Sequence, residues 1–282
     1  MRRSDLPPVL LPDATGRLTR RKALGVAALF AGPWLSACGA GSDADDAPDA
    51  ADRERLGRAY EEERQASTRL DPGVVRLVDR GDGSPHLLLR GNLPVGDTGF
   101  EYEFLLATLR DATLKAGAVW PERVQIVDVS LLNEIADSRD LQIERRFWQE
   151  HPHLGRFVHH PIFGALTDPT GLPQPIRRAL EGSGGLDRMD ELLELLRALL
   201  REPVREGVAL AVFVHCRAGR DRTGQVIASY GMRHQRQSYR DAIANADRVA
   251  GRAVLRFSRH GTQWYAYKLA DHDRVPTIGP ID

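Results

Sequence analysis

The 282-residue sequence is poor in cysteine, in net charge and in long apolar runs. Its only cysteines are Cys38 and Cys216, which excludes a disulfide-stabilised scaffold and a cysteine-rich zinc site. Basic and acidic residues number 39 each, and this zero net charge argues against a nucleic-acid-binding protein, which usually carries a basic excess. No segment is long and apolar enough to span a bilayer convincingly. Hydrophobic residues nevertheless make up 42% of the chain, which is enough to bury a core.

Residues 1–37 have the features of a removable export signal. They carry a basic excess, and the pair Arg20-Arg21 precedes a short apolar stretch over residues 23–37. An arginine pair in this position resembles a Tat export signal, and Leu35-Ser36-Ala37-Cys38 resembles a bacterial lipobox. The resemblance implies cleavage before Cys38, which would then anchor an exported protein to the bacterial cell envelope through lipid. The alternative is a buried hydrophobic N-terminal helix with a chance cysteine.

The remainder of the chain divides into a linker and one domain. Residues 39–52 are acidic and low in complexity, and we expect a flexible, charged linker over residues 38–69. Residues 70–282 then alternate between strand and helix patterns, which predicts a single α/β domain with a largely parallel central sheet flanked by helices. The expected strands cover 74–78, 87–89, 124–129, 157–163 and 208–214. The expected helices cover 101–116, 187–201 with Asp187 as N-cap, 224–232, and a segment that opens at the capping box of Ser238.

The chemistry-bearing motif follows the continuous apolar run 208–214, which has the pattern of a strand buried on both faces. Its ten residues are His215-Cys216-Arg217-Ala218-Gly219-Arg220-Asp221-Arg222-Thr223-Gly224. A loop between a buried strand and a helix directs backbone N–H groups and the positive helix end toward an anion. The same field favours a thiolate, so we expect Cys216 to be a nucleophile. The planar guanidinium of Arg222 is suited to two phosphoryl oxygens.

This motif resembles the signature of the cysteine-dependent protein tyrosine phosphatase superfamily, in which His-Cys is followed by five residues and Arg-Thr-Gly. The resemblance implies a dual-specificity phosphatase-like fold and hydrolysis of phosphomonoesters through a phosphocysteine, with no cofactor. It implies catalytic roles for His215, Cys216, Arg222 and Thr223, whose hydroxyl would bind the sulfur. Phosphate would be bound by the loop residues Arg217, Ala218, Gly219, Arg220, Asp221 and Arg222.

The substrate class stays open between phosphorylated proteins and inositol compounds. Arg217 and Arg220 stand where inositol-lipid phosphatases and several bacterial dual-specificity enzymes carry basic residues, so a phosphoinositide or inositol polyphosphate is the alternative to a phosphoprotein. A catalytically silent module that only binds phosphorylated ligands is a second alternative. The oligomeric state is left open.

The general acid has two candidates. Asp168 lies between the strand 157–163 and the next helix, where the family places a mobile acid loop, although the segment resembles the family pattern with one extra residue. It could equally belong to an Asp-Pro turn. Asp221 is the alternative acid, or else a residue that braces the loop through backbone N–H groups.

Four histidines, His151, His153, His159 and His160, suggest a metal site at first sight. No cysteine or carboxylate at matching spacing accompanies them, so the sequence predicts no metal.

Overall fold

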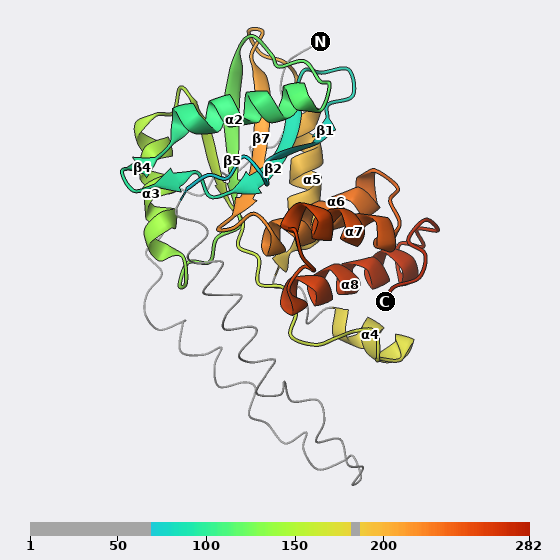
Figure 1. Cartoon of the computed structure of the whole chain (residues 1–282). Coiled ribbons are helices and arrows are strands. Elements are labelled where there is room, and N and C mark those ends of the chain that lie inside the picture. The colour runs from blue at the N-terminus through green and yellow to red at the C-terminus, as the bar shows by residue number, and fades with distance from the viewer. Residues whose placement is uncertain (1–68, 182–186) are drawn as a thin grey trace, which may run out of the picture. The chain divides into compact units, whose positions relative to one another are not determined.

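The computed structural model describes residues 69–181 and 187–282 (Figure 1). The predictions for the signal over 1–37, for Cys38 and for the linker up to residue 68 lie outside these residues. Among the helices of the described ranges, none combines the length and the apolar character that a bilayer crossing needs.

The central sheet has five strands in the order β1-β2-β7-β5-β6. Their bounds are Arg76–Arg80 for β1, Leu87–Asn92 for β2, Val124–Ser130 for β5, Gly155–His159 for β6 and Ala209–Cys216 for β7. All pairings are parallel except that of the edge strand β1 with β2. A separate hairpin joins β3 (Val95–Gly96) to β4 (Gly99–Phe100). The sheet is the largely parallel one that the sequence predicted, with β7 at its centre.

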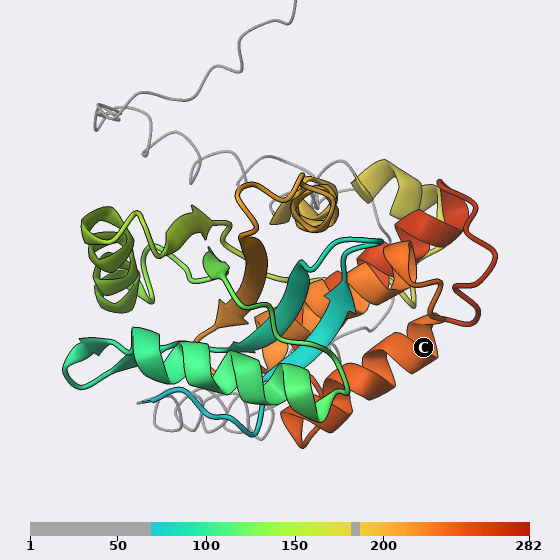
Figure 2. The same ribbon diagram turned by 90° about the horizontal axis from the view of Figure 1, so that it is seen from above.

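Helices cover both faces of the sheet (Figure 2). On one face lie α2 (Tyr102–Lys115) and α3 (Ser138–Glu150), which pack on side chains of β2, β5 and β7. The helices of the other face are α5 (Met189–Leu200), α6 (Asp221–His234), α7 (Tyr239–Ala250) and α8 (Arg256–Asp271). A short helix, α4 (Gln174–Glu181), contacts α8.

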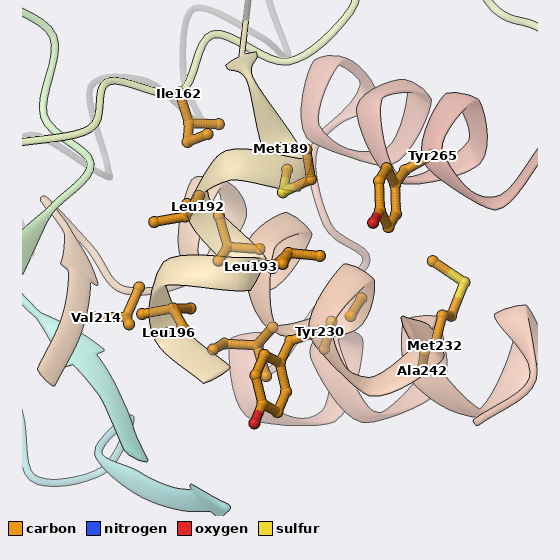
Figure 3. Close-up of a cluster of buried hydrophobic side chains, with 14 of the residues drawn as sticks. Ile162, Met189, Leu192, Leu193, Leu196, Val214, Tyr230, Met232, Ala242 and Tyr265 are labelled. Atoms are coloured by element: carbon orange, nitrogen blue, oxygen red, sulfur yellow. The ribbon is translucent and has the colours of Figure 1, made fainter. Parts of the chain in front are cut away.

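The larger core cluster lies beneath α5 to α8 (Figure 3). Leucines of α5, such as Leu193 and Leu196, point toward Val214 of β7 and Tyr230 of α6, and all four side chains are buried. Alternate residues of a strand face opposite sides of a sheet, so β7 contributes Val212 and Val214 to this cluster and Phe213 to the other. The strand that leads to the motif is therefore fixed on both faces.

Several element boundaries differ from those predicted. The strand expected over 157–163 ends at His159, and the helix expected from Asp187 begins at Met189. Asp187 is not the N-cap, because its carboxylate accepts hydrogen bonds from the backbone N–H groups of Phe163 and Gly164 and from Gln225. Ser238 is confirmed as the N-cap of α7, where it accepts from the backbone N–H of Asp241.

Candidate active site

The motif forms the loop between the end of β7 and the first turn of α6. Cys216 is the last residue of β7 and is fully buried, and Arg222 is the second residue of α6. Because β7 lies between β2 and β5, this loop sits at the carboxyl end of the central strand of a parallel sheet. That position is the usual ligand site of open α/β folds.

Four consecutive backbone N–H groups of this loop have no partner. Those of Arg217, Ala218, Gly219 and Arg220 donate no hydrogen bond to any residue of the described ranges. Ala218 and Gly219 are buried, and buried N–H groups are almost always paired in folded proteins. A run of unpaired donors that leads into the N-terminus of a helix is an anion-binding arrangement.

Gly219 gives the loop its shape. Its φ is +68°, a conformation that L side chains rarely adopt, and a Cβ there would lie 2.4 Å from the carbonyl oxygen of Gly91. The carbonyl oxygen of Gly219 accepts a hydrogen bond of 2.5 Å from the guanidinium of the buried Arg90. This contact holds the carbonyl while the N–H groups of the loop stay unpaired.

Two arginines of the loop are held by carboxylates that the sequence analysis missed. One oxygen of Asp137 accepts from Arg222 at 2.7 Å and the other accepts from Arg217 at 3.1 Å. Arg217 also donates to Asp140 at 2.6 Å. Burial opposes the charge on Asp137, but Arg222 and the hydrogen bonds of the site outweigh it, so the pKa of Asp137 is lowered. Asp137 therefore positions Arg222, and it lies 85 residues away in sequence, where no local signal marks it.

The charge of Arg217 is matched by these two carboxylates, so its side chain is directed to Asp137 and Asp140. Arg220 precedes α6 and its carbonyl oxygen accepts from the N–H of Gly224. The sequence predicts that both arginines bind phosphate, and the backbone N–H groups of both belong to the unpaired run described above.

Asp221 is enclosed at the base of α6. Arg252 donates to both of its oxygens, at 2.8 and 2.7 Å, and the backbone N–H of Leu255 adds a third hydrogen bond at 2.7 Å. The side chain thus connects the loop to the segment between α7 and α8. This is the bracing role that the sequence analysis gave as the alternative to acid catalysis.

Asp168 lies on the loop after β6, and 49% of its side chain is exposed. One oxygen accepts from the backbone N–H and the hydroxyl of Thr170, and the other lies 3.9 Å from Nε2 of His260. Partial burial raises the pKa of Asp168, but the Thr170 hydrogen bonds and the nearby cations outweigh it and lower the pKa overall. In this conformation the carboxylate caps its own turn. To act as an acid, Asp168 would have to give up its hydrogen bonds with Thr170 and form one with the oxygen of the leaving group.

His215 lies between two buried carboxylates. Its Nε2 is 3.0 Å from an oxygen of Asp128 and 3.0 Å from an oxygen of Glu144, and all three side chains have no exposed surface. Burial disfavours the imidazolium, but the two carboxylates outweigh burial and raise the pKa of His215 well above its usual value. For Glu144, burial disfavours the charged carboxylate and raises the pKa to about 7. The cation is thereby fixed one residue from Cys216.

The same three residues form the one cluster in the described ranges with the spacing of metal ligands. The other carboxylate oxygens are used by neighbouring donors, since Trp148 donates to Asp128 and Ser130 to Glu144. These two hydrogen bonds hold both carboxylates beside the imidazole. His159 and His160 each bind a backbone carbonyl oxygen instead, those of Leu132 and Asp187.

The hydroxyl of Thr223 is buried and has no hydrogen-bond partner among the described residues. The bond to the Cys216 sulfur that the resemblance implied is absent from this conformation. This unpaired buried hydroxyl is a further polar group of the β7–α6 segment that a polar ligand could satisfy.

The sequence matches no family model and no curated protein. Among solved structures, it is similar to a mutant form of Tk-PTP at 18% identity, covering 71% of this chain and 97% of that one, with a TM-score of 0.41. It is also similar to TpbA of P. aeruginosa, at 19% identity over 73% and 98% of the two chains, with a TM-score of 0.37. The core catalytic domain of the PP-IP phosphatase SIW14 from S. cerevisiae has 13% identity, coverages of 72% and 94%, and a TM-score of 0.35.

The carboxylates beside His215 should control the pH at which its imidazole loses a proton. Glu144→Gln removes one of the two anions beside the imidazole, so we expect His215 to lose its proton at a lower pH than in the unsubstituted chain. The titration can be followed by NMR of the imidazole nitrogens. Glu150→Gln is the control, because Glu150 lies on the same helix with an exposed side chain. An unchanged His215 titration in Glu144→Gln would show that Glu144 does not stabilise the cation.

Proposed function

We propose that this protein hydrolyses phosphomonoesters through a phosphocysteine formed on Cys216. The observation that carries the proposal is the run of four unpaired N–H groups between Cys216 and α6. These donors, the helix N-terminus and Arg222 together match the oxygens and the negative charge of a phosphoryl group. A thiol at the base of such a site is placed to attack phosphorus.

The reaction would run in two displacements. In the first, the thiolate of Cys216 attacks phosphorus, the bond from phosphorus to the ester oxygen breaks, and an aspartic acid gives its proton to the leaving oxygen. In the second, the same carboxylate accepts a proton from water as the water oxygen attacks phosphorus. The bond from phosphorus to sulfur breaks and inorganic phosphate leaves. Arg222 and the loop N–H groups bind the non-bridging oxygens in both steps.

We propose that Asp168 is the general acid and that Asp221 stabilises the conformation of the motif loop. Asp221 accepts three hydrogen bonds, two from Arg252 and one from the backbone N–H of Leu255. Both of its oxygens are therefore already engaged within the protein. Asp168 is half-exposed on a loop and is held mainly by Thr170, so it can turn toward a bound substrate. Opening of the turn would also remove the hydrogen bonds that lower its pKa, which favours the protonated form that the first step needs.

A phosphorylated protein side chain is the proposed substrate, of the tyrosine or dual-specificity type. The alternative of an inositol phosphate rested on the charges of Arg217 and Arg220. The Arg217 guanidinium is paired with Asp137 and Asp140, so its charge is used within the protein and does not select a multiply phosphorylated substrate.

Cys216→Ser should abolish turnover of a phosphotyrosine peptide while inorganic phosphate still binds, because the loop donors are retained and the nucleophile is lost. Cys38→Ser is the matched control, since it changes the only other cysteine and should leave turnover of a soluble substrate unchanged. Release of phosphate and equilibrium phosphate binding are the two measurements. Turnover by Cys216→Ser near that of the unsubstituted chain would exclude the phosphocysteine mechanism.

The acid assignment can be tested through the leaving group. Asp168→Asn should slow hydrolysis of phenyl phosphate by about 10²–10⁴-fold, and hydrolysis of p-nitrophenyl phosphate much less, because a stabilised phenolate needs little protonation. Asp221→Asn should instead lower the free energy of unfolding and affect both substrates alike. Equal losses on the two substrates in Asp168→Asn would contradict its role as the acid.

We also propose that the mature protein is exported and bound to the envelope by lipid at Cys38. The order of arginine pair, apolar stretch and cysteine supports this proposal. Fractionation of expressing bacterial cells tests it. The chain should sediment with membranes and incorporate labelled fatty acid, and Cys38→Ser should abolish both. Membrane association with no label would contradict a lipidated Cys38.

A further inference from the structure

A cationic pocket lies next to the motif loop and shares Arg90 with it. It has a volume of about 280 Å³ and lies between β1, β2, the end of α6 and α7. Three arginines line it, one from each of three elements: Arg76 of β1, Arg90 of β2 and Arg248 of α7. The proposed reaction uses none of these side chains to bind substrate.

Arg76 and Arg90 face each other directly across two strands. They are Cα partners in the antiparallel register of β1 and β2, so their side chains project from the same face of the sheet. Like charges directly opposite each other destabilise a sheet unless something neutralises them. Neither arginine forms an ion pair with any residue in 69–181 or 187–282. The arrangement therefore lacks a negative partner.

Arg90 shows this lack most clearly. Only 1% of its surface is exposed, and its Nε and Nη1 groups have no hydrogen-bond partner among the described residues, while Nη2 binds Gly219. A buried guanidinium with unpaired donors costs free energy in a low-dielectric interior. Burial and the charge of Arg76 lower the pKa of Arg90 to about 10, although Cys216 and Asp221 act in the opposite direction.

The other groups around the pocket also suit an anion. Gln235, Gln237 and Asn245 contribute carboxamides, and no carboxylate of the described residues lines the pocket. The acidic side chains of the two nearest elements are used elsewhere. Asp79 of β1 accepts from Tyr230 and Arg197. Asp247 of α7 accepts from Arg259 and from the backbone N–H of Val254.

We propose that this pocket is a second anion site that binds a phosphate-type dianion, either inorganic phosphate or the terminal group of a small phosphate monoester. Three guanidinium groups favour a doubly charged tetrahedral oxyanion over a single carboxylate. A pocket of about 280 Å³ accommodates such a group but no large ligand.

An anion bound in this pocket would change the electrostatic environment of the motif loop through Arg90. The same guanidinium that lines the pocket donates to the carbonyl oxygen of Gly219 and attracts the negative charge of Cys216. An anion on the pocket side would offset part of the field of Arg90 at the sulfur, so ligand and thiolate would disfavour each other. The site is thus suited to inhibition by the phosphate that the proposed reaction releases.

The test measures binding of inorganic phosphate by calorimetry to the full-length chain carrying Arg222→Ala, which weakens binding at the motif loop. We expect one remaining site. Adding Arg248→Ala should weaken that site about tenfold or more, because one charge-assisted contact is lost from an exposed residue that the fold does not need. Arg240→Ala is the control, since Arg240 lies on the same helix outside the pocket and pairs with Asp282. Arg76→Ala should act as Arg248→Ala does.

A second arm uses glycerol 3-phosphate in place of inorganic phosphate. Tighter binding would assign the site to a phosphate monoester, and equal or weaker binding would assign it to free phosphate. Absence of phosphate binding to Arg222→Ala, or equal binding with and without Arg248→Ala, would overturn the proposal. These outcomes are independent of the proposed reaction, which is tested separately by the turnover of Cys216→Ser.

Discussion

Opposite charges hold the β7–α6 loop from its outer side, and the rest of the site depends on them. Asp137 fixes Arg217 and Arg222, and Arg252 fixes Asp221. Arg90 fixes the carbonyl oxygen of Gly219. With these groups held, the backbone N–H groups of the loop have no partner among the described residues. Such preorganised donors stabilise charge without reorganisation when a reaction occurs.

The fold supplies the rigidity that this arrangement needs. Phe213 and Val214 of β7 pack into different clusters on the two faces of the sheet, so the strand before Cys216 cannot rotate or shift. Directly after them, the imidazole of His215 lies between Asp128 of β5 and Glu144 of α3, on the same face of the sheet as Phe213. Phe213 thus packs in an apolar cluster, while His215, two residues later, lies between two buried carboxylates. Burying such a charge is tolerable only because its partners are buried with it.

The parts of this site that could be predicted from the sequence are those that are local. The residues of the motif from Cys216 to Gly224 follow one another in the chain, as do those of the capping box at Ser238, so both patterns can be recognised in the sequence. Asp137 and Arg252 could not be found in this way, because only the fold brings them to the loop. The helices α3 and α8 were missed for a related reason. Their buried faces include Glu144 and His260, so the apolar periodicity that reveals a helix is interrupted. The two polar residues that interrupt the pattern contact candidate site residues, since Glu144 lies beside His215 and His260 beside Asp168.

The most direct test of the account is to look for the covalent intermediate. The full-length chain is mixed with p-nitrophenyl phosphate, quenched in acid within milliseconds and digested, and the peptide that contains Cys216 is analysed by mass spectrometry. The account predicts a transient gain of one phosphoryl group on the Cys216 sulfur that disappears as substrate is exhausted. Turnover with no phosphoryl group on Cys216 at any time, or with the group on another residue, would contradict it.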